Sequence, residues 1–311
     1  MSKQNKFLLL IFIILFVVIV TVGFVVARVF FGVSLANISG IKNNTGESEE
    51  IVRSPIHEKE TYSGPDENVE YFIDDNGNYV PDYETVEENE YDPALFYAEN
   101  DRVYYDSPSA QYGIDVSSHQ EDIDWEAVAA DGIDYAILRA AYRGYGQGTL
   151  GEDSYFRQNA EGALAAGLDI GAYVFSQAIT VEEAIEEAEY ILSVVADYDL
   201  EYPIVFDWEP IPYDTARTDN ITNQQLTEFA DAFCTRIEEA GYKAAVYFNV
   251  SQGYMEYDLE CISQYEVWLA DYDELSDFYY DFDMWQYSCE GQVNGVTGPC
   301  DMNISFKNYA A

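Results

Sequence analysis

Two carboxylates two residues apart end an apolar run near the middle of the chain. Residues 204–210 read IVFDWEP. Side chains alternate between the two faces of a strand, so Asp207 and Glu209 point the same way, roughly 6–7 Å apart, and Trp208 points the other way. Two carboxyls at this spacing can divide the roles of acid and base. An Asp-x-Glu is a common pattern, so by itself it equally describes two incidental acids at a solvated strand end.

Two further acids occupy similar places near the ends of the apolar pattern. Asp115 closes the first strand-like run, and Asp301 lies in the last apolar segment. A closed barrel brings its first and last strands side by side, so all four acids are expected to meet at one mouth. A unit charge about 6 Å away costs a second carboxylate roughly 3 kcal/mol, or about two pKa units upward. Ionised neighbours would therefore hold Glu209 protonated near neutral pH.

From Tyr112 onward, short apolar runs alternate with segments of helical periodicity. Glycines stand where three of these helices should end, at Gly132, Gly167 and Gly241. Strand–helix alternation predicts a parallel sheet covered by helices, and a domain of this length suggests a TIM-like α/β barrel. Helical patterns fade after Trp268, so the last third should be irregular. The predicted strands cover residues 112–116, 135–141, 170–175, 203–206, 244–248 and 266–269, and the predicted helices cover 124–130, 155–166, 181–195 and 223–240.

The N-terminal third differs from this barrel segment. Phe7–Ala27 is an apolar run of 21 residues preceded by Lys3 and Lys6, which predicts a transmembrane signal anchor with a cytoplasmic tip in residues 1–28. A cleaved signal peptide, cut near Ser34, is the alternative. Residues 29–111 are acidic and lack a sustained apolar period, so we expect a disordered linker there. The barrel domain would then be residues 112–311, outside the cell, or secreted if the anchor is cleaved.

Composition excludes several classes of partner. The formal net charge is -44, which opposes nucleic acid and anionic lipid headgroups, so contact with a membrane is expected through the N-terminal helix only. No Cys-x-x-C or His pair at ligand spacing occurs, so no metal and no cofactor is expected. In an exported domain the four cysteines favour disulfides, and closeness in sequence favours Cys234–Cys261 and Cys289–Cys300.

Aromatic residues are abundant, with 28 Tyr and 17 Phe. Aromatic faces can stack on the C–H faces of sugars, and burial in the core is the alternative for each of them. Arg139 ends the second predicted strand, where it would either keep one of the acids ionised or form a structural ion pair. The candidate sugar platforms at or near strand ends are Tyr173, Tyr247, Trp268, Trp285 and Tyr287.

Six segments in the same order resemble glycoside hydrolase family 25, the Chalaropsis-type muramidases, over about residues 112–308. The opening segment 113–120 (GIDVSSHQ) is followed by 171–176 (GAYVFS) and 206–209 (FDWE), and then by 268–270 (WLA), 284–288 (MWQYS) and 301–303 (DMN). One departure is Glu121, where the family often has glycine.

This resemblance implies an eight-stranded barrel with fewer than eight helices. It also implies hydrolysis of the β-1,4 bond between N-acetylmuramic acid and N-acetylglucosamine in peptidoglycan glycan strands. Glu209 would protonate the leaving oxygen, and Asp207 would orient the substrate's own 2-acetamido group. Asp115 and Asp301 would complete the acidic floor.

Several alternatives remain open at the level of sequence. A barrel that binds peptidoglycan without cutting it, as a recognition module at the cell surface, is the alternative to an enzyme. A chitin-cleaving glycosidase is disfavoured, because the run Asp-x-x-Asp-x-Asp-x-Glu typical of that family is missing before Glu209. The Asp-x-Glu spacing suits both a substrate-assisted and an inverting route. We expect the protein to act as a monomer.

Overall fold

The computed structural model of the protein describes residues 61–63, 70–73, 77 and 79–310. The predicted signal anchor, Phe7–Ala27, lies outside these residues, as does the first part of the predicted linker. Within the described ranges, no helix combines the length and the apolar character that a membrane span requires.

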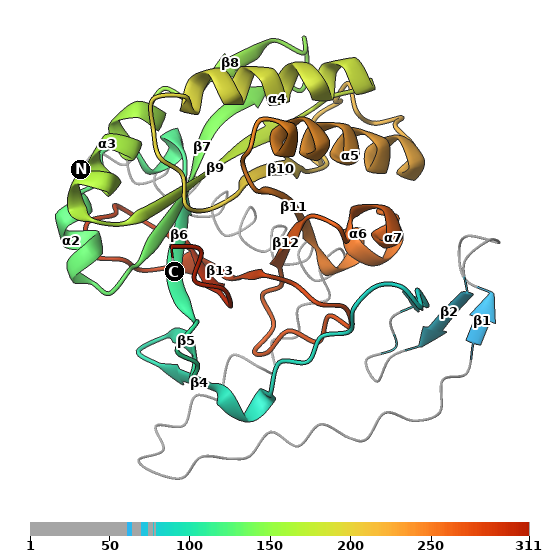
Figure 1. Ribbon diagram of the computed structural model, residues 1–311, viewed down its shortest axis with the longest axis horizontal. Helices are drawn as coiled ribbons and strands as arrows, with labels where there is room; N and C mark the ends of the chain where they lie inside the picture. The colour runs from blue at the N-terminus through green and yellow to red at the C-terminus, as the bar shows by residue number, and fades with distance from the viewer. Residues whose placement is uncertain (1–60, 64–69, 74–76, 78, 311) are drawn as a thin grey trace, which may run out of the picture. The chain divides into compact units, whose positions relative to one another are not determined.

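Eight strands close into a barrel, which confirms the predicted fold class (Figure 1). Their order around the barrel is β6–β14–β13–β12–β11–β10–β9–β7, and β7 pairs with β6 to close it. All neighbours are parallel except β14, which is antiparallel to both β13 and β6. The last part is irregular, as predicted, because no helix in the described chain separates β12, β13 and β14. The strands are β6 (Gln111–Val116), β7 (Tyr135–Arg143), β9 (Asp169–Ser176), β10 (Ile204–Trp208), β11 (Ala244–Asn249), β12 (Glu266–Ala270), β13 (Met284–Gly291) and β14 (Cys300–Ser305).

Helices cover the outside of the barrel on the side of the parallel strands (Figure 1). The four predicted helices are confirmed as α2 (Trp125–Ala130), α3 (Phe156–Ala166), α4 (Val181–Val195) and α5 (Asn223–Glu239). Thr180 and Thr222 cap α4 and α5 by accepting hydrogen bonds from Glu183 N and Gln225 N. Two short helices that the sequence did not predict, α6 (Val250–Met255) and α7 (Leu259–Ile262), follow β11.

At the amino ends of the parallel strands, aromatic and aliphatic side chains fill the interior of the barrel. Tyr135 points inward and stacks on Tyr202, with ring centroids 4.0 Å apart. A Cβ on Gly113 would lie 2.3 Å from the Tyr135 ring, so only glycine fits on β6 at that level. Because apolar packing fills this end, the polar side chains of the interior gather at the other end.

Three small pairings lie outside the barrel. Strands β1 (Thr61–Ser63), β2 (Glu70–Ile73) and β3 (Tyr79–Pro81) form an antiparallel sheet, and β4 (Phe96–Glu99) pairs with β5 (Arg102–Tyr105). Strand β8 (Leu150–Glu152) extends the barrel sheet by pairing with β7. Two single 3-10 turns, η1 (Pro93–Leu95) and η2 (Ser118–Gln120), complete the described elements.

The prediction of a disordered linker up to residue 111 is wrong for residues 79–110, which we call the strap. Tyr91 stacks on Phe306 of the C-terminal segment with ring centroids 3.9 Å apart, and its hydroxyl donates to the Phe282 carbonyl at 2.6 Å. Phe96 meets Trp285 of β13 edge-on at 5.8 Å. The strap has no apolar period because its aromatic residues contact the barrel one by one, through tertiary contacts that no local pattern reveals.

The predicted disulfides are also wrong, since all four cysteines are free. Cys234 lies on the buried face of α5, where its thiol donates to the Ala245 carbonyl at 3.7 Å, and Cys261 lies on α7. Cys300 is buried on β14, whereas Cys289 on β13 is exposed. Closeness in sequence is a poor guide here because each pair spans separate elements whose side chains face different surroundings.

Candidate active site

The four predicted acids lie at the mouth formed by the carboxyl ends of the parallel strands. Asp115 on β6 and Asp301 on β14 are direct register partners. Asp207 occupies β10, and Glu209 directly follows the end of that strand. Asp207 interacts electrostatically with both Glu209 and Asp115, so the three strands bring their acids to one place.

Asp115 is the acid whose charge is best compensated. It is 6% exposed, and its Oδ2 accepts hydrogen bonds from Gln286 Nε2 and Asn303 Nδ2, each at 2.8 Å. Burial raises the pKa of Asp115 to about 6, and the two amide donors oppose that rise. Neutral amides can satisfy a buried carboxylate without adding another titrating group to the cluster.

Asp207 has the opposite environment. Its carboxyl is buried, and Oδ1 has no hydrogen-bond partner within the protein. Burial, with the charges of Glu209 and Asp115, raises the pKa of Asp207 well above its ordinary value, and Arg139 opposes the rise. A buried acceptor without a donor costs free energy, which makes Oδ1 a natural position for a donor of a bound ligand.

Asp301 and Glu209 complete the cluster nearer the solvent. Burial, then Asp115 and Glu209, raise the pKa of Asp301 to about 8. Burial and the charge of Asp115 raise the pKa of Glu209, whose side chain remains open to solvent at the strand end. The sequence also predicted a raised pKa for Glu209. Burial is the larger cause of the rise, however, and the charge of Asp115 comes second.

Arg139 forms the structural ion pair that the sequence left as one alternative. Its Nε donates to Asp153 Oδ2 at 2.7 Å, and a second guanidinium nitrogen donates to Ser118 Oγ at 2.9 Å. Its positive charge opposes the rise in the pKa of Asp207, although Arg139 makes no direct contact with that carboxyl.

Of the predicted sugar platforms, Tyr173 on β9 is partly exposed inside the mouth. Trp268 is 2% exposed, donates from its indole to Asn303 Oδ1 at 2.8 Å, and packs edge-on against Tyr247 at 4.8 Å. These two buried rings form the floor of the site. Trp285, by contrast, points to the outside of the barrel and is fully buried, away from the mouth. Tyr287 lies on the same outer side and is buried too.

Sequence reasoning missed three side chains of the site. Gln286 and Asn303 hold Asp115, and Tyr272, which is 54% exposed, donates from its hydroxyl to Gln286 Oε1 at 2.8 Å. Tyr247 donates to the same oxygen at 2.9 Å. A signal was present, because Gln286 and Asn303 lie within the motif segments 284–288 and 301–303, and Tyr272 stands two residues beyond the end of β12.

No trio of His, Cys, Asp or Glu side chains in the described chain is arranged to hold a metal ion. The groups around the four acids are instead amides and aromatic hydroxyls, such as those of Gln286, Asn303 and Tyr173.

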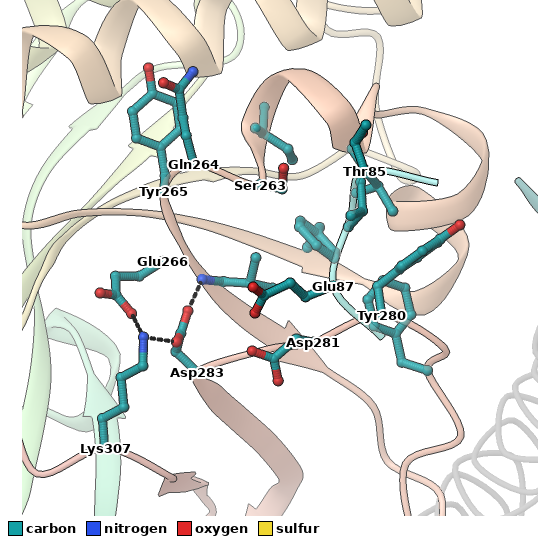
Figure 2. A pocket seen from close by; sticks show the side chains of 16 residues that line it. Thr85, Glu87, Ser263, Gln264, Tyr265, Glu266, Tyr280, Asp281, Asp283 and Lys307 are labelled. Atoms are coloured by element: carbon teal, nitrogen blue, oxygen red, sulfur yellow. Dashed lines mark hydrogen bonds and ion pairs between the residues drawn. The ribbon is translucent and has the colours of Figure 1, made fainter. Parts of the chain in front are cut away.

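A separate hollow of about 320 Å³ lies outside the barrel, at the opposite end of the strands (Figure 2). Lys307 bridges Glu266, at the start of β12, and Asp283, whose second oxygen accepts from Val267 N at 2.7 Å. Burial and Glu266 raise the pKa of Asp283 to about 7. These acids are already paired, and barrel enzymes carry their sites at the other end, so we assign no chemistry to this hollow.

Comparison with known proteins points to one family. The profile of Glycosyl hydrolases family 25 matches residues 114–296, more than half of the chain. Protein YegX of Escherichia coli K12 is 28% identical over 199 residues, covering 62% of this chain and 68% of that protein. Lysozyme M1 of Streptomyces globisporus is 27% identical over 214 residues, covering 65% and 70%.

A solved structure shares the fold. The modular autolysin LytC of Streptococcus pneumoniae, in complex with a synthetic peptidoglycan ligand, aligns with a TM-score of 0.55 at 19% identity. The alignment covers 78% of this chain and 57% of that structure, so this chain spans little more than half of the autolysin. The profile match, the closed eight-stranded barrel and the acids at its mouth agree, and the chain belongs to glycosyl hydrolase family 25.

Proposed function

We propose that this protein is a peptidoglycan hydrolase of the lysozyme type, which cleaves the β-1,4 bond between N-acetylmuramic acid and N-acetylglucosamine. The observation that carries the proposal is the meeting of Asp115, Asp207, Glu209 and Asp301 at the barrel mouth. Glycoside hydrolysis needs one protonated carboxyl and negative charge near an oxocarbenium-like centre, and this cluster offers both.

Glu209 is the proposed general acid. Its raised pKa keeps a proton available for the leaving oxygen, and its side chain is open to the mouth where a substrate enters. Asp207 is proposed to position the substrate's 2-acetamido group, whose N–H would donate to the unpartnered Oδ1. The carbonyl oxygen of that group would then attack the anomeric carbon as the bond to the leaving oxygen breaks, with Glu209 supplying the proton.

The relatives support this choice of substrate. Lysozyme M1 is named for the activity, and the autolysin structure was solved with a synthetic peptidoglycan ligand. From the sequence, we further propose that Phe7–Ala27 anchors the exported barrel at the cell membrane and that the chain acts as a monomer. Protease treatment of intact cells tests the first point, since an exported barrel would be degraded while the cytosol stays intact.

Digestion of purified peptidoglycan by the purified protein tests the activity. New reducing ends on muramic acid are expected, and reducing ends on glucosamine would assign a different bond. Glu209→Gln should lower kcat by about 10²–10⁴-fold with little change in binding. If the unmodified chain binds peptidoglycan but releases no product, the protein is a recognition module and not an enzyme.

A further inference from the structure

Two loops at the mouth carry exposed tyrosines that the proposed chemistry does not use. The glycine-rich segment 142–148 (YRGYGQG) runs from the end of β7 toward β8, and residues 210–219 follow β10. Tyr213 is 76% exposed, Tyr142 at the end of β7 is 40% exposed, and Tyr145 is partly exposed. We call Tyr142, Tyr145 and Tyr213 the tyrosine shelf.

The two loops are joined to each other, so Tyr145 and Tyr213 have a defined arrangement in the shelf. The rings of Tyr145 and Tyr213 meet nearly at right angles with centroids 6.3 Å apart. Arg217 N donates to the Tyr145 carbonyl at 2.9 Å, and the Tyr145 hydroxyl donates to Asp214 at 3.4 Å. A preformed surface loses little conformational entropy when a ligand binds.

A partly buried ion pair, which we call the clamp, holds the loop after β10 against α4. Both terminal nitrogens of Arg217 donate to Glu183, at 2.7 and 2.8 Å, and one of them also donates to the Gln177 carbonyl at 3.1 Å. A Cβ on Gly148 would lie 2.6 Å from this guanidinium, and Gly148 has a φ of +70°. The glycine therefore serves close packing against Arg217, which explains a motif that lacks any phosphate-loop spacing.

The same clamp reaches the acid cluster. Gln177 is fully buried; its amide donates to the Glu209 carbonyl at 2.9 Å and accepts from the Thr218 hydroxyl at 2.9 Å. At the end of β7, the Arg139 guanidinium lies over the ring of Tyr142, with Arg139 Cζ 5.9 Å from the ring centroid. The shelf is therefore continuous with the acidic mouth on the side of β7 and β10.

We propose that the tyrosine shelf binds sugar rings of the glycan strand beyond the two at the cleaved bond. The inference rests on the proposed function, because a polymeric substrate necessarily continues past the acids in at least one direction. Exposed aromatic rings offer flat faces to the C–H faces of sugars, and Asp214 beside them accepts hydroxyl donors. Binding at such a remote place serves to hold the scissile bond over the acids.

The test compares Tyr213→Ala with Tyr213→Phe, which keeps the ring. The Tyr213 side chain is 76% exposed, so neither change should disturb folding. The substrates are peptide-free glycan strands of defined length, from the shortest strand that is cleaved to strands several disaccharides longer. For Tyr213→Ala, KM on long strands should rise about three- to ten-fold with kcat unchanged, and the shortest strand should show no change. Tyr213→Phe should behave as the unmodified chain.

If Tyr213→Ala changes KM equally on short and long strands, or on neither, the proposal that the tyrosine shelf binds sugar is refuted. An effect seen only on strands that carry stem peptides would assign the shelf to peptide instead of sugar. Failure of the unmodified chain to cleave any strand would overturn the proposed function separately. The shelf would then be judged by calorimetric binding of the same long strands, where equal affinity of the Ala and Phe variants would refute it.

Discussion

Asp301 lies directly opposite Asp115, because the two residues are register partners in the antiparallel pair β14–β6. The pairing forces two carboxyls together at the seam where the barrel closes. Burial and the charge of Asp115 raise the pKa of Asp301 to about 8, whereas two amide donors restrain the pKa of Asp115 at about 6. Proximity of this kind costs stability and is retained where the acids do chemistry.

Asp301→Asn should stabilise the fold at alkaline pH. The folded pKa of Asp301 lies above its ordinary value of 3.8, so between roughly pH 4 and 8 the folded chain binds more protons than the unfolded chain. Its contribution to stability is present below this window and is lost as the pH rises through it. The variant should gain on the order of 2 kcal/mol at pH 8.5, after allowance for partial exposure, and little at pH 4. Urea unfolding at both pH values measures this, and equal gains at both would contradict it.

Gln286→Leu should shift the pH dependence of activity. The change removes one amide donor from Asp115, so the pKa of Asp115 should rise by roughly one unit. If the reaction needs ionised Asp115, the acidic limb of the plot of kcat/KM against pH should move to higher pH. Ser288→Ala on the same strand is a suitable control, because the Ser288 hydroxyl accepts from Glu290 N at 3.2 Å, away from Asp115. An unmoved limb would show that Asp115 ionisation does not limit the rate.

Tyr91→Ala should weaken the attachment of the strap. The substitution removes the ring stack on Phe306 and the hydrogen bond to the Phe282 carbonyl. Their loss should lower the free energy of unfolding by about 2–4 kcal/mol. Tyr97→Ala is the matched control, because Tyr97 is 50% exposed in the strap and should cost about 0.5 kcal/mol or less. Denaturant titration of the full chain distinguishes the two. Similar, small losses for both variants would mean that the strap adds nothing to the barrel.

Glu121→Gly should stabilise the protein. Glu121 follows η2 with a φ of 54° and a ψ of -134°, a conformation that glycine adopts without strain. This is the position at which the family pattern often has glycine. Relief of strain, less the entropy that glycine adds to the unfolded chain, should give about 1 kcal/mol. Glu121→Ala is the control that leaves the strain in place, and an equal gain for it would point to the lost charge instead.

The sequence predicted the barrel well because its strands and helices carry local patterns. Apolar runs marked the parallel strands, and glycines at Gly132, Gly167 and Gly241 marked helix ends, with no need for long-range information. The strap and the cysteines were predicted wrongly for the opposite reason. Tyr91 reaches a partner more than two hundred residues away, and only the fold decides what faces Cys234 or Cys300.

For the site, the sequence by itself determined which acids stand at strand ends, and strand alternation determined that Asp207 and Glu209 share a face. Tertiary structure alone decided which group compensates each acid. Gln286 and Asn303 reach Asp115 across the barrel seam, no side chain reaches Asp207 Oδ1, and Trp285 turns outward. The physical reason is that a pKa and a hydrogen bond depend on burial and on neighbours within a few ångströms. Barrel closure sets both, and spacing along the chain does not encode them.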